Sequence, residues 1–304
     1  MGALAAASLA SGGASAEDAG RGRAAPCGCC DHLSYDRRRH SCIDRFFSYS
    51  MSVGMDGYES AARPYKARLF RTLFDSLSLL PDYDDDDDDG HRRRPVSIVE
   101  VGVGAFPNAP YYAAAVSSGG GGLGATARSM GLDIIGVDPN DYMFDYARDS
   151  AVRAELSTAT TSSDADTHGG HSKVSLRTVH GVAESLPFAT GSIDAVVATL
   201  MLCSVVDQRR ALSEIRRVLR PRTGRYLFWE HVLSEDDPGL ALAQRSLSPL
   251  QTIVADGCHL DRRTGDSIRN AGFRGGVEME YAMLSLEGPG NSIIGPTVFG
   301  IATA

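Results

Sequence analysis

Short apolar runs and amphipathic segments alternate along most of the chain. Five apolar runs have the length expected of strands; they cover residues 96–101, 132–137, 174–179, 195–200 and 226–231. Apolar positions at helical spacing lie between them, in residues 105–117, 140–156 and 208–219. Polar inserts at 117–124 and 157–172 are predicted surface loops. Because strands alternating with helices imply crossover connections, the pattern predicts an α/β fold with a doubly wound, mostly parallel sheet.

The chain before the first strand divides into three parts. Residues 1–40 are expected to form a disordered tail, and residues 81–95 a charged linker. Residues 41–80 between them have near-helical spacing and are expected to form a helical cap before the main domain, residues 96–304. Several side chains of the cap either pack in the core or close a ligand pocket. They are Phe46, Phe47, Tyr49, Met51, Met55 and Tyr58.

The charge distribution limits the classes of partner. The formal net charge is -8, and most of it comes from the six consecutive aspartates at 84–89. No broad basic surface remains for nucleic acid, so a small-molecule partner is expected. The most apolar segment, residues 193–206, is too short to span a bilayer and contains an aspartate, so no integral membrane anchor is expected.

The cysteines are interpreted as reduced, intracellular thiols, because a chain of this length needs no disulfide framework. They are Cys27, Cys29, Cys30, Cys42, Cys203 and Cys258. The spacing around Cys27 and His32 does not fit a paired metal site, so no metal is predicted. Cys203 lies in an apolar run, which is typical of inert packing thiols, and no Cys–His pair is marked. The Ala- and Ser-rich start allows a plastid-type transit peptide as well as a cytoplasmic location.

A glycine-rich turn follows the first strand in the pattern Glu100-x-Gly102-x-Gly104. Such a turn lets a ligand approach the backbone, although a purely structural turn would have the same composition. A nicotinamide fingerprint would need glycine at position 107, where Pro107 stands, and this disfavours an oxidoreductase.

Asp138 ends the second strand, where a carboxylate can bind both ribose hydroxyls of a nucleoside cofactor. The alternative is that Asp138 caps the following helix, with Pro139 at the first helical position.

The glycine pattern resembles motif I of class I S-adenosylmethionine (SAM)-dependent methyltransferases, and residues 180–188 look like the adenine-side loop of the type 11 group. The resemblance implies a seven-stranded Rossmann-like sheet and SAM as cofactor. Glu100 would support the loop or the cofactor ammonium. Two departures are Phe106, at the usual third glycine, and Val182, at a usual acidic position. The remaining cofactor contacts implied are Ala183, Glu184 and Leu200.

Three further regions are similar to the methyltransferase-like thiol S-methyltransferases and their plant and algal relatives: residues 199–205, residues 214–232 and residues 256–260. This resemblance covers roughly residues 96–304 and implies methyl transfer from SAM to a small thiol. Animal members carry an N-terminal hydrophobic anchor that this sequence does not show, so their membrane location is not expected here.

Three residues of these regions are candidate catalytic groups: His231, Asp256 and His259. Each has a structural alternative, respectively a strand-end histidine, a turn cap before Gly257 and a packed core histidine.

Two other functions of the chain stay open. One is methylation of oxygen, nitrogen or carbon on a lipid-like or quinone substrate, and the other is SAM binding without turnover. The oligomeric state is not predicted.

Overall fold

The computed structural model describes residues 41–78, 95–117, 131–158, 174–286 and 291–304. The predicted tail, nearly all of the charged linker and most of both polar inserts lie outside the described residues. The same is true of Cys27, Cys29, Cys30 and His32.

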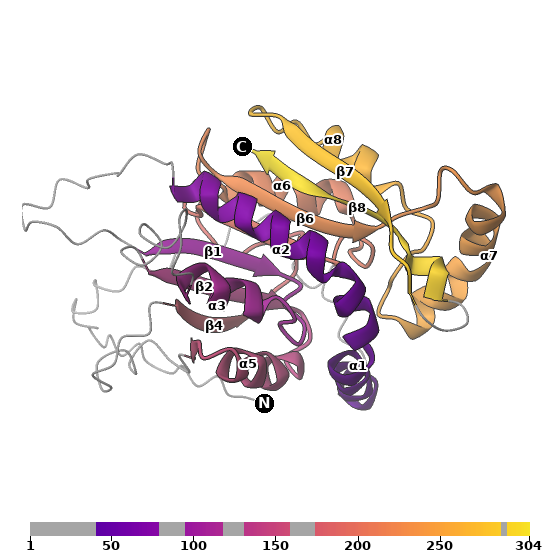
Figure 1. The fold of residues 1–304 in the computed structure, drawn as a ribbon, viewed down its shortest axis with the longest axis horizontal. Helices are drawn as coiled ribbons and strands as arrows, with labels where there is room; N and C mark the ends of the chain where they lie inside the picture. Colours follow the sequence, from indigo (N-terminus) through magenta and orange to yellow (C-terminus); the bar gives the residue numbers. More distant parts are fainter. Residues whose placement is uncertain (1–40, 79–94, 118–130, 159–173, 287–290) are drawn as a thin grey trace, which may run out of the picture. The chain divides into compact units, whose positions relative to one another are not determined.

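A single mixed sheet organises the described chain, in the order β3-β4-β2-β1-β5-β6-β8-β7 (Figure 1). Its strands are β1 (Val96–Val101), β2 (Leu132–Asp138), β3 (Ser157–Thr158), β4 (Val174–His180), β5 (Ala195–Thr199), β6 (Arg225–His231), β7 (Val277–Met283) and β8 (Pro296–Thr303). Neighbours pair in parallel except β8, which is antiparallel to both β6 and β7. Seven strands were expected; the eighth is the two-residue β3, which pairs with β4 at the edge.

Helices cover both faces of the sheet (Figure 1). They are α1 (Ser41–Gly54), α2 (Asp56–Ser78), α3 (Ala109–Ser117), α5 (Met143–Arg153), α6 (Gln208–Val218), α7 (Pro238–Val254) and α8 (Thr264–Arg269), with the 3-10 turn η3 (Asn291–Ile294). Side chains of β1 alternate between two cores: Ile98 packs with α2 and α3, and Val99 packs with α6 and α8. The sheet is therefore doubly wound, as the alternation of strands and helices along the sequence predicted.

The helical cap differs in detail from the sequence expectation. It is two helices that meet at Met55, and the second of them, α2, packs in the core through Leu69, Phe70 and Leu73. Among the described helices, none combines the length and the apolar character that a membrane crossing requires.

A buried cation joins α2 to the sheet. The Lys66 side chain has no exposed surface, and its Nζ donates hydrogen bonds to both carboxylate oxygens of Glu59, at 2.8 and 2.9 Å, and to Asn108 Oδ1 at 3.2 Å. Asn108 Nδ2 donates in turn to Glu100 Oε1 at 2.9 Å and to Thr199 Oγ1 at 3.1 Å. The network links the helix before the domain to the ends of β1 and β5, and we call it the Lys66 network.

Replacing Lys66 by methionine should destabilise the protein by about 3 kcal/mol, because it leaves buried acceptors without their donor. Urea unfolding monitored by circular dichroism measures the change. The matched control is Arg68→Met on the same helix. Arg68 pairs with Glu280, both side chains are more than half exposed, and the loss should be about 1 kcal/mol or less. Equal losses in the two variants would contradict the role of the Lys66 network.

Candidate functional site

A pocket opens at the carboxyl ends of the central parallel strands. The loops after β1, β2, β4 and β5 form its floor and sides, and α1 forms another side. The lining includes most of the predicted cofactor residues: Gly102, Gly104, Asp138, Ala183, Glu184 and Leu200. Loops at the carboxyl ends of parallel strands, where strand order reverses, are the usual ligand site of a doubly wound sheet.

The two glycines of the loop after β1 meet different structural requirements. Gly102 has φ +69°, and a Cβ there would lie 2.8 Å from the Met201 side chain. Gly104 has φ +51°, and a Cβ there would meet nothing closer than 4.0 Å. Gly102 is thus required by close packing, whereas Gly104 leaves its backbone accessible from the pocket.

Phe106 is one of the two departures from the methyltransferase motif, and its backbone conformation accounts for it. It has φ 58° and is fully buried, with its ring stacked on Tyr112 at 5.6 Å between centroids. Its N–H donates to Val103 O at 2.8 Å. The left-handed conformation that favours glycine is therefore kept, and the cost of the Cβ is offset by core packing. This turn also delays α3, which begins at Ala109 and not at residue 105 as predicted.

Glu100 is buried beneath the pocket and is not among the residues that line it. Its two carboxylate oxygens accept hydrogen bonds from Asn108 Nδ2 and, at 2.7 Å, from the Tyr112 hydroxyl. Burial raises the pKa of Glu100 to about 7, although these hydrogen bonds and Lys66 act against the rise. Glu100 thus contacts residues of the segment after the glycine loop and does not line the pocket.

Asp138 faces the pocket with a nearly buried carboxylate. Oδ2 accepts from Gly104 N at 3.0 Å, and Oδ1 accepts from Asn140 N at 2.9 Å. Burial raises the pKa of Asp138 to about 6. The helix-cap alternative is wrong: α5 has Tyr142 as its N-cap, because residues 139–142 first form a turn in which Asn140 Oδ1 accepts from Tyr142 N.

Glu184 fastens the loop that follows β5. Its Oε1 accepts from Val206 N at 2.7 Å and from Asp207 N at 3.1 Å, and its carbonyl accepts from Arg210. Its neighbour Ala183 lines the pocket, and so does Leu200, which has φ 55°. One oxygen of the Glu184 carboxylate thus accepts from two backbone donors.

One face of α1 closes the pocket. Phe47 and Met51 of α1 line it at helical spacing, together with Asp44 and with Met55 at the junction of α1 and α2. Asn140 holds this helix in place, because its Nδ2 donates to Asp44 O and to Ser48 Oγ, each at 3.1 Å. Asn140 was missed from the sequence, where only its place after Asp138 could have suggested a role.

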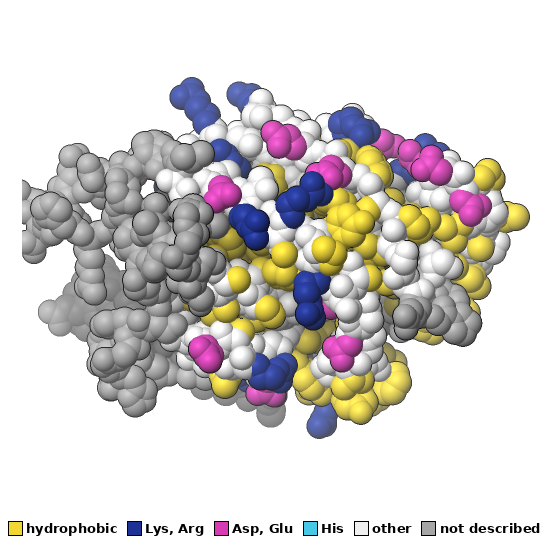
Figure 2. Space-filling view, in the orientation of Figure 1, with side chains coloured by type: hydrophobic (Ala, Val, Ile, Leu, Met, Phe, Trp, Pro, Cys, Tyr) yellow, Lys and Arg dark blue, Asp and Glu magenta, His cyan; other side chains and the backbone are white. Residues whose placement is uncertain are grey.

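The other predicted cap side chains do not line the pocket. Phe46 and Tyr49 are exposed on the outer face of α1, where Figure 2 shows a cluster of hydrophobic side chains. Tyr58 is buried, and its hydroxyl accepts from Trp229 Nε1 at 2.8 Å. The sequence spacing alone could not separate these three positions from the lining ones.

The three catalytic candidates are divided between the pocket and its surroundings. Asp256 lines the pocket and has φ 51°, whereas His231 and His259 do not line it. His231 Nε2 lies 3.1 Å from Cys258 Sγ, and the donors of Cys203, His231 and Cys258 all lie within 4.8 Å of one another. The statement that no Cys–His pair is marked was therefore wrong. Tertiary folding brings these residues together from three separate loops and strands.

Comparison with known proteins finds a similarity over part of this chain. A family model described as a methyltransferase domain matches residues 115–228, a range that holds β2, β4 and β5 and the loops after them. The fold is the doubly wound, mostly parallel sheet that the sequence predicted.

Curated relatives of this chain carry thiol S-methyltransferase names. Thiol S-methyltransferase TMT1B of Rattus norvegicus is 44% identical over 93 residues, 31% of this chain and 37% of the relative. Thiol S-methyltransferase TMT1A of Homo sapiens is 44% identical over 85 residues, 28% of this chain and 34% of the relative. The matches thus span about a third of the curated relatives.

Solved structures are more distant. A SAM-dependent methyltransferase from Thermotoga maritima, described as a possible histamine N-methyltransferase, is similar with a TM-score of 0.42 and 18% identity. The similarity covers 82% of this chain and 99% of that one.

Glu100→Gln should flatten the pH dependence of the free energy of unfolding. The folded pKa of Glu100 lies above the unfolded value, so the folded state keeps a proton between about pH 4.5 and about pH 7 that the unfolded state has lost. The free energy of unfolding therefore falls as pH rises through this window, and glutamine removes up to about 1.4 kcal/mol per pH unit of that fall. Urea midpoints at pH 5 to 7 test this, with the exposed Glu280→Gln as control; an unchanged slope in Glu100→Gln would refute it.

Proposed function

We propose that this chain is a SAM-dependent methyltransferase that transfers a methyl group to a small acceptor, and that the acceptor is a thiol. The observation that carries the proposal is the hydrogen bond from the Gly104 N–H to the Asp138 carboxylate, because both residues line the pocket. The match of residues 115–228 to a methyltransferase domain supports it. The thiol clause rests on the names of the relatives.

The proposed cofactor site uses each loop differently. Asp138 keeps lone pairs beyond its two backbone contacts, and these would accept hydrogen bonds from the ribose hydroxyls. Gly104 would let the amino-acid end of SAM approach the backbone. Ala183 and Leu200 would flank the adenine. Glu100 and Glu184 would act through the loops that they hold.

The proposed reaction is an in-line displacement. The acceptor sulfur forms a bond to the methyl carbon, while the bond from that carbon to the sulfonium breaks, and S-adenosylhomocysteine leaves. The thiol proton departs first, because the thiolate is the nucleophile. Alignment of acceptor, methyl and leaving sulfur supplies the main acceleration, so no covalent protein intermediate is needed.

The proposed acceptor site is the α1 side of the pocket. Phe47, Met51 and Met55 offer apolar surface there, as small-molecule sites usually require. Asp256 is the candidate that could accept the thiol proton, since it lines the same pocket. His231 and His259 do not line it, so we propose for them at most a positioning role through the surrounding loops.

Two alternative functions would use the same cofactor but differ in the atom that is methylated or in whether methyl transfer takes place. Methylation of oxygen, nitrogen or carbon on a lipid-like or quinone substrate would use the same apolar surface. A SAM-binding protein without turnover would use the same cofactor contacts. Radiolabelled transfer from SAM to a panel of thiols, phenols and quinones separates the three.

The free thiols of Cys203 and Cys258 support a reducing, intracellular location, cytoplasmic or in an organelle. The small-molecule pocket supports an acceptor other than nucleic acid.

Asp138→Asn should weaken SAM binding about 10-fold to 100-fold, because a charged acceptor for the ribose is lost while the side-chain shape is kept. Isothermal titration with SAM and S-adenosylhomocysteine gives the dissociation constants. The control is Asp145→Asn on α5, whose side chain is mostly exposed. Unchanged affinity in Asp138→Asn would remove the ribose assignment.

Met51→Trp should lower turnover of a small thiol at least 10-fold with little change in SAM affinity, because the larger ring fills space on the acceptor side. Tyr49→Trp, on the exposed face of the same helix, should leave both unchanged. Methyl transfer and SAM titration are measured on the same preparations. If Met51→Trp weakened SAM binding and turnover equally, the α1 face would belong to the cofactor site.

A further inference from the structure

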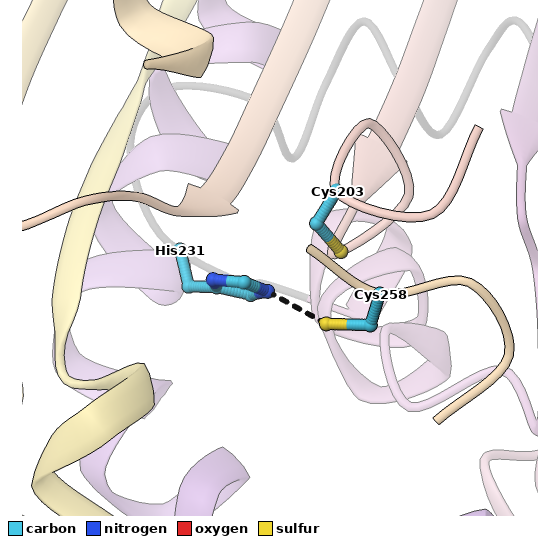
Figure 3. A group of neighbouring side chains, drawn as sticks. All are labelled: Cys203, His231 and Cys258. Atoms are coloured by element: carbon cyan, nitrogen blue, oxygen red, sulfur yellow. Dashed lines mark hydrogen bonds between the residues drawn. The ribbon is translucent and has the colours of Figure 1, made fainter. Parts of the chain in front are cut away.

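Three soft or borderline ligands meet beside the cofactor pocket, in a place that the proposed methyl transfer does not use. Cys203 follows β5, His231 ends β6 and Cys258 follows α7. Figure 3 shows both sulfurs and the imidazole ring converging on one point. Their exposed fractions are only 2%, 3% and 8%.

We propose that Cys203, His231 and Cys258 bind one thiophilic divalent metal ion of the zinc class. Cysteine thiolate and histidine nitrogen are the ligands that zinc prefers, at about 2.3 Å and about 2.0–2.1 Å respectively. A tetrahedral ion at these lengths needs donors about 3.4–3.8 Å apart. The His231 Nε2–Cys258 Sγ distance is 3.1 Å, and all three donors lie within 4.8 Å of one another, so side-chain adjustments of about 1 Å close the site.

The charge balance favours a divalent ion. Two thiolates and a neutral imidazole cancel the charge of the cation, which lowers the cost of burying it. Binding releases one proton from each cysteine. If the single N–H proton of a neutral His231 is on Nδ1, an atom without a hydrogen-bond partner among the described residues, the Nε2 lone pair points toward Cys258, the orientation that a metal ligand needs.

The protein supplies three ligands, because no fourth His, Cys, Asp or Glu of the described residues belongs to this group. A water or a small exogenous ligand would complete the tetrahedron. The ion would also join two segments that line the cofactor pocket. Ser204 adjoins Cys203, Asp256 lies two residues before Cys258, and both line that pocket. The His259 N–H already bridges these segments by donating to Cys203 O at 2.9 Å.

Metal titration of the full-length chain tests the proposal without SAM or acceptor, so its outcome is independent of methyl transfer. The host carries Cys27→Ser, Cys29→Ser and Cys30→Ser, which removes competing thiols near the N-terminus. The reduced, chelator-treated host is titrated with Co²⁺ and then with Zn²⁺. We expect one equivalent to bind, with a near-ultraviolet thiolate-to-cobalt band, visible bands of a four-coordinate ion, and release of two protons. Zinc should then displace the cobalt and remove the bands.

Single substitutions in that host assign the ligands. Cys203→Ser and Cys258→Ser should each weaken Zn²⁺ binding at least 100-fold and reduce the thiolate band. Cys42→Ser, which changes an exposed cysteine outside the group, should change neither. The cobalt spectrum of the host itself counts the thiolates even where a variant folds poorly.

Three results would overturn the proposal. The first is that the reduced host shows no thiolate band, and the second is that binding survives both Cys203→Ser and Cys258→Ser. The third is that mass spectrometry of the freshly purified chain finds Cys203 and Cys258 joined as a disulfide, and that dioxygen forms this disulfide again in the reduced chain even when Zn²⁺ is present.

Discussion

A lysine without exposed surface has to be surrounded by acceptors, and the region beneath the pocket is arranged around that requirement. Glu59 neutralises the charge of Lys66, and Asn108 passes the hydrogen bonding on to Glu100 and Thr199. Residues from the preceding helix, from the segment after β1 and from β5 thereby share one polar network. Glu100 lies near the end of β1 and Thr199 ends β5, so the network holds the strand ends from which two loops of the pocket begin.

The fold was largely predictable because it depends on local periodicity. The five apolar runs became strands with nearly the expected ends, and the acid that ends β2 lies at the pocket because all parallel strands end at one edge. The break of the cap at Met55 was not predictable, since both helices continue the same spacing. The extra strand β3 is two residues long, too short for any periodicity to show.

The site residues could be predicted from the sequence only where the backbone conformation requires a particular residue type, such as glycine. Gly102 and Gly104 both have a positive φ, which favours glycine, but nothing in the sequence distinguishes an acid that lines a pocket from one that supports it. Glu100 and Glu184 proved to hold loops through hydrogen bonds to partners that tertiary folding brings near. The Cys203–His231 proximity has the same origin, because its members lie in elements that are distant along the chain.

Phe106 has a consequence for engineering by consensus. A designer who restored the usual glycine would relieve left-handed backbone strain of about 1–3 kcal/mol. The same change would empty the space against Tyr112, and removal of a buried phenylalanine side chain usually costs about 3–5 kcal/mol. At this position, therefore, the glycine of the motif that the sequence resembles would make the protein less stable, because it would leave empty the buried space that the Phe106 ring fills.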